Sequence, residues 1–138
     1  HSLRVIFGAV FLLMVMVGVL PAVFAIPAGA GDVLVGLGAF PASGWLRSGR
    51  WGRVLAWNML GVLDFVLAIA LGVFTTTGPL HLIAVSPSSA WLLSPPLVVV
   101  PTFVVPFYLL LHFVSLRYLA VMRNQAQFAP AARMEVSA

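Results

Sequence analysis

Four long apolar runs constrain the fold of this chain more than any other feature of its sequence. A helix needs roughly 20 residues to cross a hydrocarbon core of about 30 Å. The runs that approach or exceed this length are residues 5–25, 28–46, 54–75 and 96–121. We therefore predict an all-α integral membrane bundle of four transmembrane helices, which form a single domain over residues 1–138.

The composition agrees with this class and removes several kinds of activity. Of the 138 residues, 62% are hydrophobic and 7% are charged, whereas a soluble domain carries about a quarter charged residues. The absence of cysteine excludes disulfides, thiolate metal sites and thiol catalysis. No phosphate loop, H-E-x-x-H motif or serine with a nearby His and acid is present. We expect no enzymatic activity and no bound metal.

The ends of the first run and the interior of the fourth depart from a simple span. Arg4, the apolar run and the "VFA" that ends at Ala25 imitate a cleavable leader. A chain that starts at His1 rather than Met leaves room for a further helix upstream. Pro101 and Pro106 lie inside the fourth run, and each removes a backbone hydrogen bond. We predict that the fourth helix is kinked by proline.

The arginines predict the orientation. Under the positive-inside rule, basic residues collect in cytoplasmic loops. The chain has no lysine, and its arginines are Arg4, Arg47, Arg50, Arg53, Arg117, Arg123 and Arg133. All seven fall on one side if both ends of this segment are cytoplasmic and the loop at residues 76–95 is extracytoplasmic. The +4 net charge is then a topology signal, and no nucleic-acid partner is expected. A composition rich in Ala, Val, Gly, Pro and Arg suggests a bacterial inner membrane.

An aspartate in the middle of the third run indicates an intramembrane polar site. Asp64 lies about 16 Å in from Arg53 at 1.5 Å per residue, near the bilayer midplane. An ionisable group at this depth is costly and normally faces protein or a water-filled cavity. Asn58 falls on the same face of the helix. The fourth run contributes Tyr108, His112 and Ser115 at i, i+4 and i+7, and we predict Tyr108 and His112 as the partners of Asp64.

Small residues predict a helix-packing face, because only close approach or hydrogen bonding favours helix association in lipid. The residues of this face are Gly61, Ala68 and Gly72 in the third run and Gly36, Ala39 and Ser43 in the second. Asp32 is expected near the outer surface as a cap for the second helix. The first run shows no polar stripe and is expected to face lipid or to pack through Gly8 and Gly18.

Three functions fit these features. The first is a non-enzymatic protein that acts through helix packing, as a homo-oligomer or an accessory subunit of a larger membrane complex. The second is a proton- or ion-coupled carrier that uses Asp64 with Tyr108 and His112. The third is a subunit that binds haem, a pigment or quinone through His112. We favour the first, with no cofactor, and with the lipid bilayer and other membrane subunits or further copies of the chain as partners.

Overall fold

The computed structural model describes the backbone of residues 1–135 and the side chains of residues 1–125. Within this range all regular structure is helical, which confirms the predicted all-α class. The helices are α1 (Arg4–Met16), α2 (Ala22–Arg47), α3 (Trp51–Thr75) and α4 (Val105–Glu135). A 3₁₀ turn, η1 (Ser89–Leu93), and a π-helical segment, η2 (Val100–Val104), precede α4. Three helices, at 22–47, 51–75 and 100–125, are long and apolar enough to cross a membrane.

The first predicted span differs most from the structure. α1 has 13 residues, or about 20 Å at 1.5 Å per residue, which is less than the hydrocarbon core. It ends where Gly18 adopts a φ of +70°, a left-handed conformation that suits glycine at a helix C-terminus. Pro21 then precedes the first residue of α2. The apolar run at 5–25 is therefore a short helix, a turn and the start of α2, which begins at residue 22 rather than 28.

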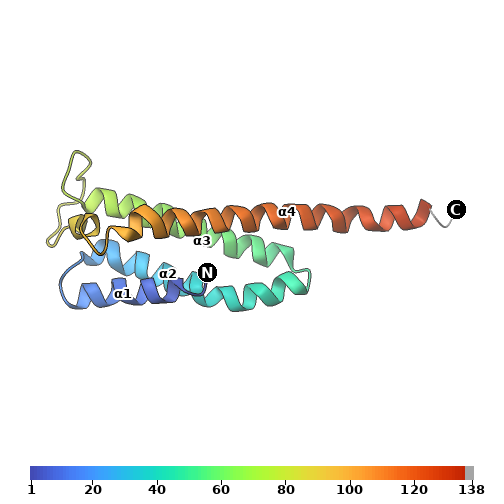
Figure 1. Ribbon diagram of the computed structural model, residues 1–138, viewed down its shortest axis with the longest axis horizontal. Helices are drawn as coiled ribbons and strands as arrows, with labels where there is room; N and C mark the ends of the chain where they lie inside the picture. Colours follow the sequence, from blue (N-terminus) through green and yellow to red (C-terminus); the bar gives the residue numbers. More distant parts are fainter. Residues whose placement is uncertain (136–138) are drawn as a thin grey trace.

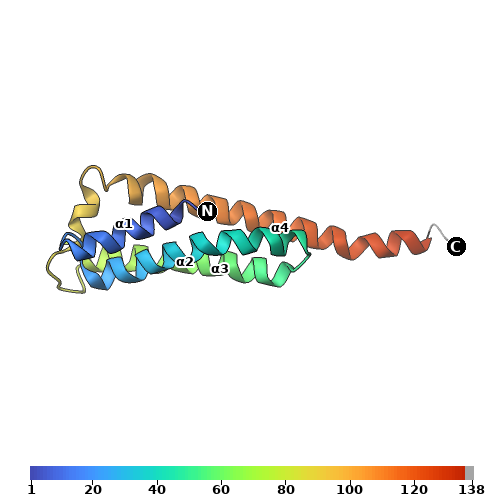
Figure 2. The ribbon, with the colours of Figure 1, turned by 90° about the horizontal axis from the view of Figure 1, so that it is seen from below.

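The helices run alternately up and down, and α1 covers only half of α2 (Figure 1). The start of α1 lies midway along the bundle in both perpendicular views (Figures 1 and 2). α1 packs on α2, α2 packs on α3, and α4 packs mainly on α3. The midpoint of the bundle is thus the level at which the first residues of α1 meet α2.

Prolines occur in both α2 and the approach to α4. α2 accommodates Pro27 and Pro41 within its length. Pro101 lies in the π-helical segment η2, and Pro106 lies in the first turn of α4. A π-helical turn is a local distortion of the kind that lets a helix absorb lost backbone hydrogen bonds. The predicted proline kink itself stays a prediction.

Apolar packing is concentrated at the end of the bundle opposite the α2–α3 turn. Phe11 and Phe24 pack edge to face with ring centroids 5.5 Å apart. The buried cluster joins α1, the 17–21 turn, α2 and η1, and consists of Phe11, Leu20, Phe24, Ala25, Ala28 and Leu92. It fixes the turn that reverses the chain between α1 and α2.

A group of hydroxyl side chains, which we call the hydroxyl cluster (Thr75, Thr76 and Ser89), ties η1 to the end of α3. Thr75 Oγ1 donates to Leu71 O at 2.6 Å and lies 2.9 Å from Ser89 Oγ. Ser89 Oγ lies 2.7 Å from Gly72 O and 2.6 Å from Thr76 Oγ1. Gly72 O also accepts from the backbone N–H of Thr76 at 3.1 Å. The hydroxyls therefore add hydrogen bonds to carbonyls at the end of α3, and Ser89 joins η1 to them.

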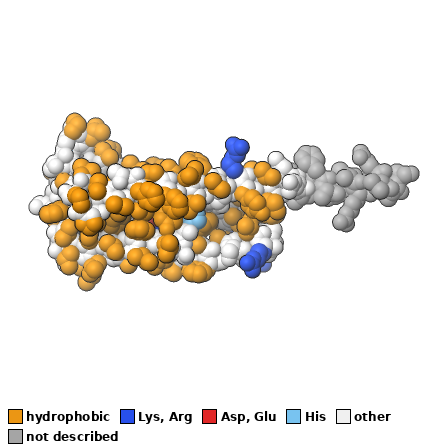
Figure 3. Space-filling model, viewed as in Figure 1, with side chains coloured by type: hydrophobic (Ala, Val, Ile, Leu, Met, Phe, Trp, Pro, Cys, Tyr) orange, Lys and Arg blue, Asp and Glu red, His pale blue; other side chains and the backbone are white. Residues whose placement is uncertain are grey.

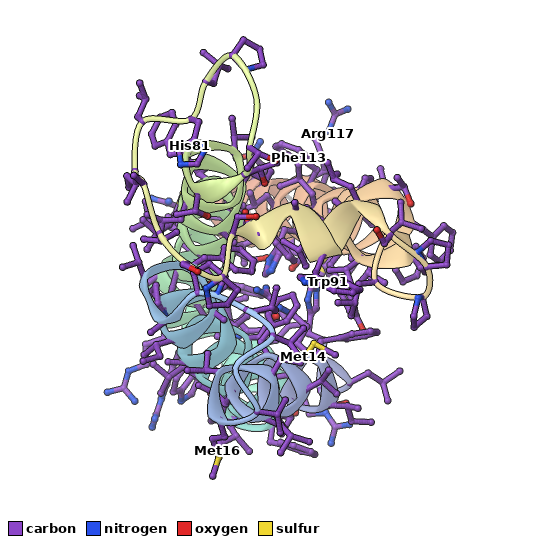
Figure 4. All side chains as sticks on the ribbon, turned by 90° about the vertical axis from the view of Figure 1, so that its left-hand side faces the viewer. Met14, Met16, His81, Trp91, Phe113 and Arg117 are labelled. Carbon is purple, nitrogen blue, oxygen red and sulfur yellow. The ribbon has the colours of Figure 1, made fainter. Side chains whose placement is uncertain are left out.

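The outside of the described bundle is largely apolar (Figure 3). Leu34 of α2, Leu63 of α3 and Leu110 of α4 are all more than half exposed. Seen from the loop end, Met16 and Arg117 point outward from the helices (Figure 4). An apolar surface of this extent is unusual for a protein in water and marks an interaction surface.

Candidate functional site

Arg4 is the centre of a buried polar network in the middle of the bundle. Its side chain lies in the first turn of α1 and is completely buried. Nε donates to Asp32 Oδ1 of α2 at 2.7 Å, and Nη2 donates to Asp64 Oδ2 of α3. The guanidinium therefore forms ion pairs with two different helices.

His112 of α4 extends the network to the fourth helix. Its Nε2 lies 3.2 Å from Arg4 Nη1, and its Nδ1 lies 3.1 Å from Asn58 Oδ1. A guanidinium nitrogen can only donate and an amide oxygen can only accept. His112 must accept at Nε2 and donate from Nδ1, which is the arrangement of a neutral imidazole. Asn58 is oriented in turn by donating from Nδ2 to Val54 O at 2.9 Å.

An aromatic ring completes the surroundings of the guanidinium. Arg4 Cζ lies 3.9 Å from the centroid of the Phe65 ring. A guanidinium over an aromatic face is attracted by the ring quadrupole, more strongly when both are away from water. Phe65 and Asp64 are neighbours in α3, so consecutive residues contact Arg4 through different interactions. We call Arg4, Asp32, Asp64, Asn58 and His112 the charged network.

Glycines make the room that the charged network needs. A Cβ added to Gly31 would overlap the Asp64 carboxyl, and one added to Gly61 would overlap the His112 ring. Where α1 crosses α2, a Cβ on Gly29 would lie 2.9 Å from Gly8 O. Close approach of helix backbones at small residues is the usual packing mode of membrane helices. The small residues here bring the polar side chains of four helices together.

The predicted polar residues separate into two groups. Asp64, Asn58 and His112 belong to the charged network. Tyr108 is buried one turn from His112, and its ring packs against Phe7 at a centroid distance of 6.4 Å. Ser115 is half-buried and lies outside the network. Within the described part of the chain, the hydrogen-bond partner of Asp64 is Arg4, so the predicted pairing with Tyr108 and His112 is corrected.

The predicted packing face lies mostly inside the chain. Gly36 and Gly61 are buried, and Ala39, Ala68 and Gly72 are half-buried. A Cβ added to Gly36 would lie 2.7 Å from Val5 of α1, and one added to Gly72 would lie 3.5 Å from Phe24 of α2. Ser43 is different, because it is exposed and donates to Phe40 O of its own helix at 2.7 Å.

Two expectations about charged residues are wrong. Asp32 does not cap the second helix near a surface, because α2 starts ten residues earlier, at Ala22, and this places Asp32 in the buried middle. Arg4 is not an interfacial topology marker, because α1 begins halfway along the bundle and buries it. One feature of the sequence could have identified Arg4 as a buried residue. Two acids in apolar runs need a cation, and Arg4 lies on the same helical face as Gly8 and Phe11, the other buried residues of α1.

An apolar cavity of about 530 Å³ borders the charged network. Its charged lining residues are Arg4, Asp32 and Asp64, and the opposite end reaches residues 76–80 after α3. Aromatic rings from all four helices line its length, namely Phe7, Phe11, Phe24, Phe65 and Tyr108. The volume is in the range of small-molecule sites, which combine apolar walls with a few placed polar groups.

The arrangement offers little to a metal or an axially ligated cofactor. Among the described residues, no three His, Cys, Asp or Glu side chains are grouped so that they could hold a metal ion. His112 uses both ring nitrogens within the charged network. His81 lies in the loop after α3 and its Nε2 is buried without a partner. The charged network offers ion pairing, hydrogen bonding and proton exchange at two carboxyls.

Comparison with known proteins gives a family and nothing more. No curated protein and no solved structure matches the chain. A family model described as "Domain of unknown function (DUF8737)" matches residues 1–120, which contain the whole charged network. The chain belongs to this family.

Proposed function

We propose that the chain is a non-enzymatic multi-pass membrane protein that acts through helix packing. The observation that carries this proposal is the charged network, in which each helix supplies a polar group that another helix of the same chain satisfies. A carboxylate at mid-membrane depth is tolerated when it is paired inside a bundle. Asp64 then serves to hold α3 against α1, and its main role is structural.

We further propose a bacterial inner membrane location with the α2–α3 turn on the cytoplasmic side. Arg47, Arg50 and Arg53 flank this turn, and Arg117 and Arg123 lie in the part of α4 that runs toward the same end. The 17–21 turn and the 76–99 loop contain no arginine. The orientation therefore rests on the arginines other than Arg4, whose side chain is buried. Arg133 lies outside the residues whose side chains are described.

Partners of this protein would contact the apolar exterior. Gly36 and Gly61 are already covered by α1 and α4, so they are not free to pack against another chain. The exposed apolar residues of all four helices face either lipid or a second membrane protein. We propose that a homo-oligomer or a larger complex would form on these surfaces.

A carrier is the second candidate, because the cavity reaches Asp64 and Asp32. One guanidinium faces two carboxylates, so a single proton or cation would make the charged network neutral. Coupled transport uses acids of this kind inside membrane proteins. The haem, pigment or quinone reading has less support, because both His112 nitrogens are engaged.

Proton flux into proteoliposomes separates the packing protein from the carrier. We expect no flux above protein-free vesicles for the wild type or for Asp64→Asn, and intact folding of both, because the amide keeps a hydrogen-bonding group of similar size. Ser43→Ala, which lies outside the network, is the control for effects of purifying and reconstituting a variant. A wild-type flux that Asp64→Asn removes while Ser43→Ala retains it would replace the packing proposal with the carrier.

A further inference from the structure

The charged network is not electrically balanced. It contains the carboxylates of Asp32 and Asp64 and a single guanidinium, while His112 is neutral by its hydrogen-bonding pattern. Among the described residues, no other charged side chain lines the cavity beside it. Uncompensated charge in an apolar surrounding is unfavourable. These five residues therefore have an excess of one negative charge when both acids are ionised; His1, whose ring centroid lies 4.2 Å from that of His112, is a further titratable group beside them.

Both acids keep one carboxylate oxygen that Arg4 does not occupy. Arg4 occupies Oδ1 of Asp32 and Oδ2 of Asp64, and the other carboxylate oxygens have no partner among the described residues. The two side chains remain 12% and 8% exposed, although they lie in the middle of the bundle. Both residues line the cavity, and Asp64 Oδ1 lies against Gly31 of α2. Arg4 has five N–H donors, and three of them are used toward Asp32, His112 and Asp64.

The remaining walls favour a cation with a long apolar tail. The rings of Phe7 and Tyr108 pack together in the lining, next to the residues of the charged network. Aromatic faces and carboxylates together are the groups that recognise ammonium ions. From Asp64 to Thr76, which also lines the cavity, is 12 residues of α3, or roughly 18 Å. This length, with apolar walls throughout, suits an alkyl chain.

We infer that the cavity is a binding site for a single-chain amphiphile whose ammonium head group pairs with Asp64 and Asp32 and whose alkyl tail extends toward residues 76–80. The head group supplies the missing positive charge, and the tail displaces water from the aromatic walls. The same chemistry is offered by an amine-bearing membrane lipid and by a free lipophilic amine. This inference does not depend on whether the protein packs, carries protons or does neither.

Three probes with the same tail test the head-group preference in protein purified in dodecyl maltoside: dodecylamine, dodecanol and dodecanoate. A ligand that binds only the folded state raises the melting temperature according to its affinity. We expect dodecylamine to raise it most and dodecanoate least, with at least about a tenfold difference in apparent affinity from charge complementarity. Equal shifts for the three probes, or a larger shift for dodecanoate, would overturn the inference.

Two variants connect the preference to the cavity. Asp64→Asn leaves Arg4 and Asp32 as a balanced pair, so dodecylamine should lose its advantage over dodecanol. Ala68→Phe fills the cavity and should reduce the shifts of both probes, while Ala56→Phe on the exposed side of α3 should not. Should Ala68→Phe fail to fold, the Asp64→Asn comparison decides alone. An unchanged preference in Asp64→Asn contradicts the inference.

Nanodiscs distinguish the two sources of ammonium. In phosphatidylglycerol discs, whose head groups carry no ammonium, the dodecylamine shift should persist. If added lysophosphatidylethanolamine, a single-chain lipid with a primary ammonium, removes the shift by competition, the natural ligand is a membrane lipid, and if it does not, the ligand is a free amine. Absence of the shift in phosphatidylglycerol discs would overturn the inference.

Discussion

The molecule contains two polar clusters, one at the end of α3 and one in the middle of the bundle, and their polar groups find hydrogen-bond partners in different ways. The hydroxyl cluster at the end of α3 is uncharged: Thr75 and Thr76 donate to carbonyls one turn away, and Ser89 joins them from η1, 17 residues from Gly72. The charged network in the middle joins residues as far apart in sequence as Arg4 and His112. The first attaches a loop to one helix end, whereas the second depends on all four helices being in place. Long-range polar contacts, and not apolar burial alone, therefore define how this bundle is assembled.

The comparison predicts the largest loss of stability for Arg4→Met. This change keeps an apolar stem and removes the one cation from two buried carboxylates. Loss of one member of a buried ion pair costs about 3–5 kcal/mol, because the other charge stays buried and unpaired. Reversible unfolding in mixed dodecyl maltoside and SDS micelles measures the change. A loss below about 1 kcal/mol, typical of an exposed ion pair, would show that the network is peripheral.

An intermediate effect is expected when the space for the network is filled. Gly61→Ala places a Cβ where the His112 ring lies, so α4 must shift and the bundle should lose about 1–3 kcal/mol. Gly44→Ala is the matched control, because a Cβ there meets nothing within 4 Å. It should gain up to about 1 kcal/mol from helix propensity. Similar free energies of unfolding for the two variants would mean that α4 is not held against Gly61.

The smallest effect is expected in the hydroxyl cluster. Ser89→Ala removes one hydroxyl but leaves Thr75 and Thr76 bonded to carbonyls of α3. A neutral hydrogen bond contributes about 0.5–1.5 kcal/mol, so the unfolding free energy should fall by that amount. Hydrogen exchange should increase in residues 86–93 and remain unchanged around Asp32. A loss as large as that of Arg4→Met would remove the distinction between the clusters.

Much of the fold could be predicted from the sequence, because hydropathy and length determine where apolar helices form. The third helix was expected at 54–75 and occurs at Trp51–Thr75. The break in the first run was not predicted, although Gly18 and Pro21 are both present in the sequence. By length alone, its 21 residues predict a single membrane span. The two residues that end α1 and start α2 outweigh hydropathy, because they act on the backbone directly.

The candidate site could be predicted in part, because periodicity gives the face of a helix but not the depth at which helices meet. Helical periodicity placed Asp64 with Asn58 on one face of α3, and the structure puts both in the charged network. The partner of Asp64 depends on which residues meet at the same depth, and that depends on where each helix starts. If the first run spans the membrane, Arg4 falls at the surface. If the second helix begins at residue 28, Asp32 falls there too.

The ion pair between Arg4 and Asp64 joins α1 to α3 in the middle of the bundle, and a double-mutant cycle tests it most directly. The cycle compares the unfolding free energies of Arg4→Met, Asp64→Asn and the double variant with that of the wild type. Residues in contact through a charged pair show coupling, whereas independent sites add within about 0.3–0.5 kcal/mol. We predict that the double variant loses at least about 1.5 kcal/mol less than the sum of the single variants. Additive losses would contradict the ion pair and, with it, the placement of α1 against α3 at the middle of the bundle.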